Sequence, residues 1–165
     1  MGNKILNSNR VYYDSPAGTL EIREKNGKIN SVRFVSKKIK GVSSASNAVL
    51  KKCLRELREY FSKKRKFFAV PFSADGTDFQ KKVWKELSRL PFGATAAYSE
   101  IAARAGNPRA VRAVGSACGA NPLAVIVPCH RVVGKSNALS GYAGGISKKR
   151  RLLDHENGKD KEKNS

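Results

Sequence analysis

The sequence is short of acidic residues and of long apolar stretches. Its 165 residues include 13 Asp and Glu against 33 Lys and Arg, which gives a formal net charge of +20. A membrane-spanning helix needs about 20 consecutive apolar residues, and no segment comes near that length. Asn, Lys and Arg side chains interrupt the start of the chain, so no signal peptide is expected there. These absences favour a cytoplasmic protein without a membrane partner.

Cysteine is also scarce, because the chain has only Cys53, Cys118 and Cys129 and no C-x-x-C spacing. An odd number of cysteines without paired spacing suggests neither a disulfide framework nor a zinc cluster. We therefore expect reduced thiols, no metal and no other cofactor. Cys53 and Cys118 both fall on apolar stripes of predicted helices, where a free thiol usually serves as core packing.

The surplus of positive charge is far larger than solubility requires. A field of this strength attracts a polyanion at long range, and nucleic acid is the partner that it favours. The alternative is a solvated basic surface on a protein that binds nothing anionic. Charge alone does not decide between these two interpretations.

Hydrophobic patterning divides the chain into two domains and a tail. Residues 1–75 are predicted to form a small α/β domain, and a turn-rich stretch at 67–76 marks its boundary. Residues 76–157 are predicted to form a mostly helical domain. Residues 158–165 are polar and lack aromatic anchors, so we expect a flexible tail.

Local patterns predict the elements of each domain. Residues 11–35 alternate as strands with a turn at 26–28, and an amphipathic helix follows between 43 and 61. In the second domain, Thr77 or Asp78 can cap a helix. The apolar run Leu123–Val127 is predicted to be a short buried strand.

Two short helices separated by a tight turn are predicted between 98 and 120. Ser99 can cap the first helix, and Gly106 suits its C-terminal end. Asn107 can cap the second helix, with Pro108 at its first position, where the missing N–H costs nothing. Such a pair is a candidate helix-turn-helix, and an ordinary αα-hairpin without a DNA role is the alternative.

The second of these helices carries mostly small side chains on its outward face. Helical spacing turns Val111 and Val114 inward together with Cys118. The outward residues are Arg109, Arg112, Ala113, Ser116 and Ala117. Such a face lets the backbone approach DNA closely and project an arginine, which suits lesion searching better than base reading. We therefore take Arg109, Arg112 and Ser116 as candidate DNA-binding residues.

The segment VIVPCHRVV places a thiol and an imidazole after an apolar run that Pro128 ends. A thiol near its ordinary pKa is mostly protonated at neutral pH, so a nucleophilic Cys129 needs a base or a positive charge nearby. His130 and Arg131 are candidates for both. Neighbouring side chains of an extended chain point to opposite faces, so a water molecule or a turn at Pro128 must link Cys129 to His130.

A histidine base also benefits from a third group that orients it. Asp154 and Glu156 lie downstream, and spacing does not choose between them. The residue pattern also leaves open whether Cys129 is a nucleophile or a satisfied buried thiol beside a surface histidine.

The loop SGYAGG, residues 140–145, offers the aromatic ring of Tyr142 among glycines. An aromatic wall beside free backbone groups is what a pocket for an extruded base requires. An ordinary tight turn is the alternative.

Several stretches taken together resemble the methylated-DNA–protein-cysteine methyltransferase family, which repairs O6-alkylguanine. In chain order they are SPAGTL, DFQKKVWKELSRLPFGATAAYSEIA, NP, VPCHRVV, GYAGG and LLDHE. The combination of PCHRV and GYAGG at this spacing is the most specific part. The resemblance implies an N-terminal α/β domain of ribonuclease-H-like shape and a mostly helical C-terminal domain with a helix-turn-helix.

The resemblance also implies a reaction. Cys129 would attack the alkyl carbon on O6 of guanine and keep it as a thioether, so that each chain acts once and irreversibly. His130 would deprotonate Cys129 through a water and be oriented by Glu156, and the sulfur would be held ionised. Tyr98 would protonate or hydrogen-bond the departing base. O4-alkylthymine is a second candidate substrate.

For DNA binding, the resemblance implies a monomer that enters the minor groove of double-stranded DNA and flips the target nucleotide out of the duplex. Arg112 would fill the vacated place, and Asn121 would lie at the turn that carries the recognition helix into the site. Tyr142 would line the base pocket, with backbone groups near Val132 and Ala143 contacting the base.

Two other functions fit parts of the pattern. A protein of the same fold could sense alkylated guanine without repairing it, but such relatives lack the cysteine. A cysteine hydrolase using Cys129 and His130 would turn over repeatedly without DNA. That function leaves the charge and the Arg112 helix unexplained.

Overall fold

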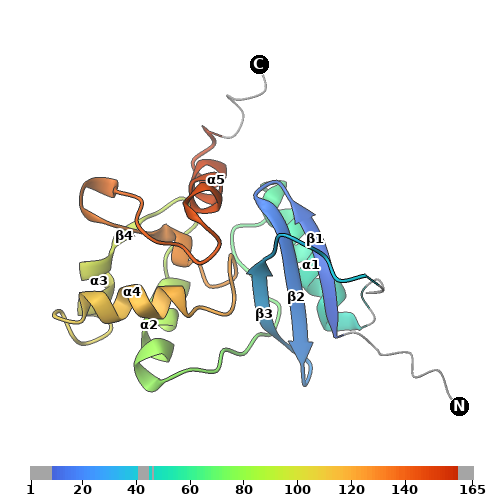
Figure 1. Cartoon of the computed structure of the whole chain (residues 1–165), viewed down its shortest axis with the longest axis horizontal. Helices are drawn as coiled ribbons and strands as arrows, with labels where there is room; N and C mark the ends of the chain where they lie inside the picture. The colour runs from blue at the N-terminus through green and yellow to red at the C-terminus, as the bar shows by residue number, and fades with distance from the viewer. Residues whose placement is uncertain (1–8, 41–44, 46, 160–165) are drawn as a thin grey trace, which may run out of the picture.

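A three-stranded antiparallel sheet forms the N-terminal unit of the computed structural model, which describes residues 9–40, 45 and 47–159. The strands β1 (Arg10–Ser15), β2 (Gly18–Lys25) and β3 (Lys28–Phe34) lie in chain order (Figure 1). Asn26 and Gly27 adopt φ angles of 52° and 75° at the β2–β3 turn. A two-residue hairpin needs this left-handed backbone at both positions, so the turn predicted from Asn-Gly is confirmed.

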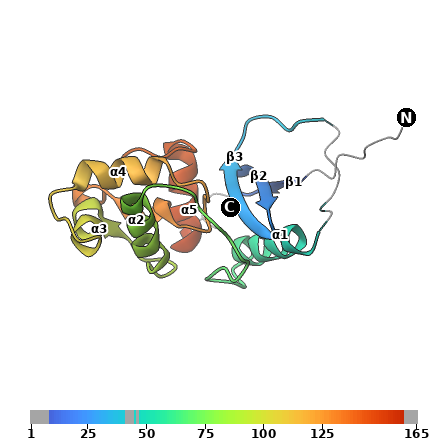
Figure 2. The ribbon, with the colours of Figure 1, turned by 90° about the horizontal axis from the view of Figure 1, so that it is seen from below.

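Helix α1 (Ala48–Phe61) covers one face of this sheet (Figure 2). The side chain of Asn47 caps it by accepting a hydrogen bond from the backbone N–H of Leu50 at 2.9 Å. Cys53 lies on the buried stripe of the helix, and burial raises the pKa of its thiol to about 12. The predicted packing role of Cys53 is confirmed.

The C-terminal unit consists of helices, two short 3₁₀ segments and a parallel strand pair. In chain order these are α2 (Asp78–Ser88), β4 (Ala96–Ala97), α3 (Tyr98–Arg104), α4 (Val111–Gly119), η1 (Cys129–Arg131), β5 (Val132–Val133), η2 (Lys135–Asn137) and α5 (Ile146–Glu156). Thr77 and Gln80 form a reciprocal capping box at the start of α2, where the sequence predicted a helix to begin.

The predicted N-caps of α3 and α4 are wrong, whereas Gly106 follows the C-cap Ala105 of α3 with a φ of 92°, as predicted. Helix α3 begins one residue before Ser99, which therefore lies inside the first turn. The side-chain oxygen of Asn107 accepts a hydrogen bond from the backbone N–H of Arg109 at 3.2 Å and closes a local turn. Because this turn uses the Asn107 side chain, α4 begins only at Val111 and Pro108 lies outside the helix.

The buried face of α4 also differs from the prediction. Val111 was expected to point inward but is 39% exposed, whereas Ala117 was expected to point outward and is 1% exposed. Val114 is buried as predicted, and Cys118 is half-buried. The indole N–H of Trp84 on α2 donates to the carbonyl of Ala117 at 2.8 Å, which fixes this face of α4 against α2.

Residues 123–127 form turns rather than the predicted strand. The backbone N–H of Val127 donates to the carbonyl of Leu123 at 2.9 Å, and Val125 adopts a φ of 70°, which is unusual for a β-branched residue. Only Leu123 makes a bridge to β3. The apolar composition therefore reflects burial of the segment and not an extended backbone.

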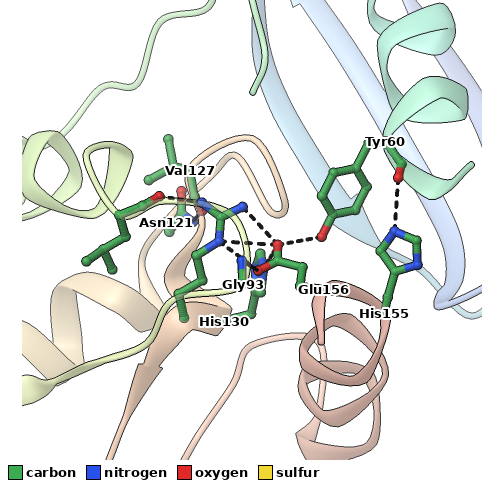
Figure 3. Close-up of polar contacts among 9 residues, drawn as sticks. Tyr60, Gly93, Asn121, Val127, His130, His155 and Glu156 are labelled. Atoms are coloured by element: carbon green, nitrogen blue, oxygen red, sulfur yellow. Dashed lines mark hydrogen bonds and ion pairs between the residues drawn. The ribbon is translucent and has the colours of Figure 1, made fainter. Parts of the chain in front are cut away.

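Hydrogen bonds join the N-terminal and C-terminal units at two places, on β3 and on α1. On β3, the N–H of Val32 donates to the carbonyl of Pro122 at 2.8 Å, and the N–H of Ala124 donates to the carbonyl of Val32 at 2.9 Å. On α1, the carbonyl of Tyr60 accepts a hydrogen bond from His155 of α5 at 2.9 Å (Figure 3). Helix α5 is accordingly the C-terminal helix that faces the sheet unit (Figure 2).

None of the helices in the described part of the chain combines the length and the apolar character needed to cross a bilayer.

Candidate active site at Cys129

Cys129 opens the 3₁₀ turn η1 directly after Pro128 and is 5% exposed. Its sulfur accepts a hydrogen bond from the Nδ2 atom of Asn121 at 3.1 Å. The same amide donates to the carbonyl of Val127 at 2.8 Å (Figure 3), and its Oδ1 atom accepts from the N–H of Leu123 at 2.9 Å. Asn121 thus fixes the sulfur against the turns that precede it.

His130 follows in the same turn and is fully buried. Its Nε2 atom lies 2.8 Å from an oxygen of Glu156 (Figure 3). Since an ionised carboxylate only accepts hydrogen bonds, Nε2 carries the ring proton and Nδ1 is the acceptor. Nδ1 has no hydrogen-bond partner among the described residues. The choice between Asp154 and Glu156 that spacing left open therefore falls on Glu156.

Glu156 is the centre of a buried polar cluster. Its carboxylate accepts hydrogen bonds from the Tyr60 hydroxyl at 2.7 Å, the Gly93 N–H at 3.1 Å and the Arg131 guanidinium at 2.8 Å. Burial alone would raise the pKa of Glu156, but the hydrogen bonds and charges of His130 and Arg131 outweigh it and hold that pKa well below its usual range. The carboxylate is therefore ionised.

The expected positive charge at the sulfur is not supplied by Arg131. Its guanidinium bonds Glu156 and donates to the carbonyl of Leu90 at 2.5 Å. Burial raises the pKa of the Cys129 thiol, and the Asn121 hydrogen bond and the Lys149 charge offset this only in part. The expectation of an ionised sulfur in the resting protein is therefore wrong, because desolvation disfavours the thiolate.

The imidazole is also neutral at rest. Burial lowers the pKa of His130, and its hydrogen bond to Glu156 acts in the opposite direction. A neutral imidazole whose Nδ1 has no partner among the described residues is able to accept a proton. The arrangement can therefore generate a thiolate during a reaction without holding one beforehand.

Lys149 is a site residue that sequence reasoning missed. It is fully buried on α5, and its ammonium donates to the carbonyl of Ser140 at 2.9 Å and lies 3.4 Å from the hydroxyl of Tyr98. The Tyr98 hydroxyl itself donates to the same Ser140 carbonyl at 3.2 Å. Because Lys149 lies in a run of basic residues, its burial was not predictable from the sequence.

Tyr60 was also missed, although it had a signal. It lies at helical spacing from Cys53 and Leu57 on the apolar stripe of α1, so its burial was predictable. Its hydrogen bond to Glu156 was not, because the two residues are 96 positions apart.

A cavity of about 520 Å³ opens beside Cys129 towards α3 and α4. Tyr98, Arg112, Tyr142 and Ala143 line it together with Cys129, so the structure brings these predicted site residues to one place. The hydroxyl of Tyr142 is buried without a hydrogen-bond partner in the described part of the chain. Burial raises the pKa of Tyr142 well above its usual value, so this hydroxyl is protonated and can donate.

Other predicted residues lie outside this cavity. Val132 is fully buried in β5, where it pairs with Ala96 of β4. Arg109 precedes α4, and Ser116 lies on its exposed face. Cys118 was predicted to pack in the core, but it also lines the cavity. Burial raises the pKa of its thiol to about 12.

Over the ranges that the structure covers, no three His, Cys, Asp or Glu side chains gather closely enough to hold a metal ion.

Fold and site together define a class of protein in which a small sheet domain precedes a helical domain that holds buried Cys, His and Glu side chains. Two family patterns match the chain. Residues 10–74 match "6-O-methylguanine DNA methyltransferase, ribonuclease-like domain", and residues 78–158 match "6-O-methylguanine DNA methyltransferase, DNA binding domain". The chain belongs to the 6-O-methylguanine DNA methyltransferase family.

Similar proteins agree with this membership. A probable methylated-DNA–protein-cysteine methyltransferase of Acanthamoeba polyphaga mimivirus is 51% identical over 131 residues, which are 78% of this chain and 82% of that protein. The constitutive methylated-DNA–protein-cysteine methyltransferase of Bacillus subtilis is 42% identical over 139 residues, covering 79% and 84%. The crystal structure of Mycobacterium tuberculosis OGT in complex with DNA is 40% identical with a TM-score of 0.80, and the match covers 89% of this chain and 91% of that one.

Proposed function

We propose that this protein repairs DNA directly by moving an alkyl group from O6 of guanine to the sulfur of Cys129. The observation that carries the proposal is the position of Cys129 on a cavity wall, next to a buried histidine that a buried glutamate orients. The printed activity of the relatives at 51% and 42% identity supports the same reaction. O4-alkylthymine is a second substrate that we propose for the same cavity.

The reaction needs two proton transfers, one from the thiol and one to the departing guanine. Nδ1 of His130 takes the thiol proton through a water molecule, because Nδ1 is the ring nitrogen left without a protein partner. The thiolate then forms a bond to the alkyl carbon while the bond from that carbon to O6 breaks. The electron pair stays on the guanine, which takes a proton from the Tyr98 hydroxyl on that side of the cavity and leaves as neutral guanine. The protons balance when the His130 imidazolium releases a proton to solvent and the Tyr98 phenolate takes one up.

The transfer is irreversible, so each chain acts once. A thioether has no acidic proton and is a poor leaving group. Cys118 lines the same cavity, but its thiol is protonated at neutral pH and does not provide a nucleophile that would remove the alkyl group.

The DNA is bound through α3 and α4, which we propose to act as a helix-turn-helix in the minor groove. Arg112 is exposed at the rim of the cavity, where it can fill the place of a flipped nucleotide. Arg109 and Ser116 contact the backbone, and Asn121 couples the end of α4 to the sulfur. Tyr142 walls the flipped base, and the Ala143 backbone contacts it.

The proposal extends to the architecture. Residues 1–75 form a domain of ribonuclease-H-like shape, residues 76–157 bind DNA and carry the reaction, and the protein works as a monomer in the cytoplasm. Most of the proposed tail, 158–165, lies outside the described residues. The side chain of Val132 in β5 is fully buried, so at this position we propose that only the backbone contacts the base.

A labelled-substrate experiment tests the function. The protein is incubated with a duplex oligonucleotide that carries radiolabelled O6-methylguanine, and the label on the chain is counted. We expect about one label per chain, located on Cys129 by peptide mapping, and none for Cys129→Ser. Cys53→Ser is the matched control, because that thiol lies in the core of the sheet domain.

The labelling experiment also distinguishes repair from the two alternative functions, a lesion sensor and a cysteine hydrolase. Tight binding to the lesion with no label on any cysteine would indicate a sensor and would contradict the proposal. Repeated turnover of an ester or amide substrate without DNA would indicate a hydrolase.

A further inference from the structure

A second cavity meets Cys129 from the side of the N-terminal domain. It has a volume of about 300 Å³, and β3 supplies Val32, Arg33 and Phe34 to its lining. Cys129 and Tyr142 belong to both cavities. The sulfur therefore lies at the junction between the cavity on the α4 side, which we propose for the base, and a space that reaches the sheet.

The stereochemistry of the proposed transfer requires room beside the sulfur. The sulfur approaches the alkyl carbon in line with the bond to O6 that breaks. Any substituent on that carbon then projects sideways from the line that joins sulfur, carbon and oxygen. A methyl group needs almost no space there, whereas a larger alkyl group needs a compartment next to Cys129.

The interdomain cavity is built to provide this compartment. Its helical-domain side carries small residues: Gly119, Ala120, Ala124, Ala143 and Gly144. The large apolar side chains are Phe34 from the sheet and Tyr142 from the loop, with ring centroids 6.4 Å apart in an edge-on arrangement. A side chain at Gly144 would place its Cβ 2.7 Å from the Phe34 ring, so the ring already touches the loop backbone.

Phe34 is also held at a fixed place relative to the sulfur. Two residues earlier on β3, Val32 exchanges main-chain hydrogen bonds with Pro122 and Ala124 at 2.8 and 2.9 Å. The ammonium of Lys148 on α5 lies 5.7 Å from the centre of the Phe34 ring. A change of ring size at position 34 therefore alters the cavity more than it alters the docking of the sheet.

We infer that the interdomain cavity receives the O6 substituent and that Phe34 of the N-terminal domain determines which substituents are accepted. This inference rests on the proposed alkyl transfer to Cys129. It makes the sheet domain part of the substrate site. Phe34 is a specificity-determining residue that touches the substituent and takes no part in proton transfer.

Competition between two substituents tests the inference. Duplex oligonucleotides carrying O6-methylguanine and O6-benzylguanine are offered to the protein, and the second-order rate constants of labelling Cys129 are compared as a benzyl-to-methyl ratio. Filling the cavity with Phe34→Trp should lower this ratio about tenfold, and Phe34→Leu should raise it about tenfold, at the lower end of the range that one methylene group produces in a binding pocket.

Tyr13→Leu is the matched control. Tyr13 is a partly buried aromatic residue of the same sheet, but its ring packs against Phe61 at 6.0 Å and lines neither cavity. A general weakening of the sheet would slow both substrates in Tyr13→Leu and in both Phe34 variants without moving the ratio. The ratio is therefore a readout that a purely structural role would leave unchanged.

The outcomes keep this inference apart from the proposed function. If neither substrate labels Cys129, the proposed transfer fails. If methyl is transferred but benzyl is not, or if the ratio stays within twofold in both Phe34 variants, the transfer stands and the inference about Phe34 is overturned.

Discussion

At the scale of single residues, Glu156 carries a buried negative charge that several donors share. Its side chain is fully buried, and the Arg131 guanidinium that neutralises it is 6% exposed. A buried ion pair is weak evidence of net stability, but removing one partner leaves the other charge uncompensated. Glu156 therefore has two effects, since it orients His130 and it neutralises Arg131.

Glu156→Gln separates the charge from the shape of the side chain. We expect the free energy of unfolding at pH 7 to fall by about 3 kcal/mol, because Arg131 stays buried without its counter-charge. The transfer rate should also fall, because the amide holds the His130 ring less firmly. Asp154→Asn on the same helix is the control, and chemical denaturation measures both variants.

The contribution of Glu156 to the free energy of unfolding depends on pH. The folded-state pKa of Glu156 lies below its ordinary value of 4.5, so its contribution is complete above that pH. The contribution is lost as the pH falls from 4.5 towards the folded-state pKa. The stabilities of the wild type and Glu156→Gln should therefore converge in acid, and a constant difference down to pH 3 would contradict this account.

Only some of the site residues could be predicted from the sequence. Cys129 and His130 were recognisable because they are adjacent in a motif, and Glu156 came from the resemblance. Spacing could not choose Glu156 over Asp154, since that choice depends on how α5 packs against η1. The protonation of the sulfur was not predictable, because the burial that raises its pKa is a property of the whole fold.

At the scale of elements, α5 holds the 140–145 loop through one side chain. Lys149 donates to the Ser140 carbonyl and approaches the Tyr98 hydroxyl, so it joins α5, the loop and α3. The loop carries Tyr142, which walls both cavities. Loss of this anchor should therefore open the loop locally and leave the rest of the fold in place.

Lys149→Met tests the anchor. We expect chymotrypsin to cleave after Tyr142 on the order of tenfold faster, because losing these hydrogen bonds lowers the cost of local opening by about 1–3 kcal/mol. Arg150→Met removes a neighbouring exposed charge and is the control. Mass spectrometry of a cleavage time course measures the rate, and equal rates in the two variants would mean that Lys149 does not hold the loop.

Elements differed in how well sequence patterns predicted them. Helices α1 and α2 follow from apolar stripes and caps that lie next to each other in the chain. The predicted start of α4 was wrong because the Asn107 side chain closes a turn and does not cap the helix. In both structures its oxygen accepts a hydrogen bond from a backbone N–H a few residues later, so the sequence does not distinguish them. Residues 123–127 were taken for a strand because periodicity cannot tell a buried turn from a buried strand.

At the scale of the whole molecule, positive charge is spread over more surface than one DNA contact needs. Exposed basic residues occur on α1, α2, α4 and α5; they include Lys51, Arg58, Lys81, Lys82, Lys85, Arg112, Arg150 and Arg151. Helix α1 lies against the sheet, away from α3 and α4 (Figure 1). The net charge of +20 therefore attracts DNA as a distant field, while only part of it can touch phosphates.

This distinction predicts the salt dependence of DNA binding. Each phosphate contact contributes about −0.9 to the slope of log association constant against log salt, so about five contacts on the α4 side give a slope near −4.5. A slope set by all the basic residues would be several times steeper. Fluorescence anisotropy of a labelled, undamaged duplex over a series of salt concentrations measures it.

Paired variants assign the contacts to a face. Arg109→Ala and Arg112→Ala should each make the slope shallower by about one, because each removes a cation that displaces a counterion from a phosphate. Lys51→Ala and Arg58→Ala remove the same charge from α1, so they should slow association slightly and leave the slope unchanged. If the α1 variants change the slope as much as the α4 variants do, the duplex lies across the sheet domain, and the proposed approach of α4 to the minor groove is wrong.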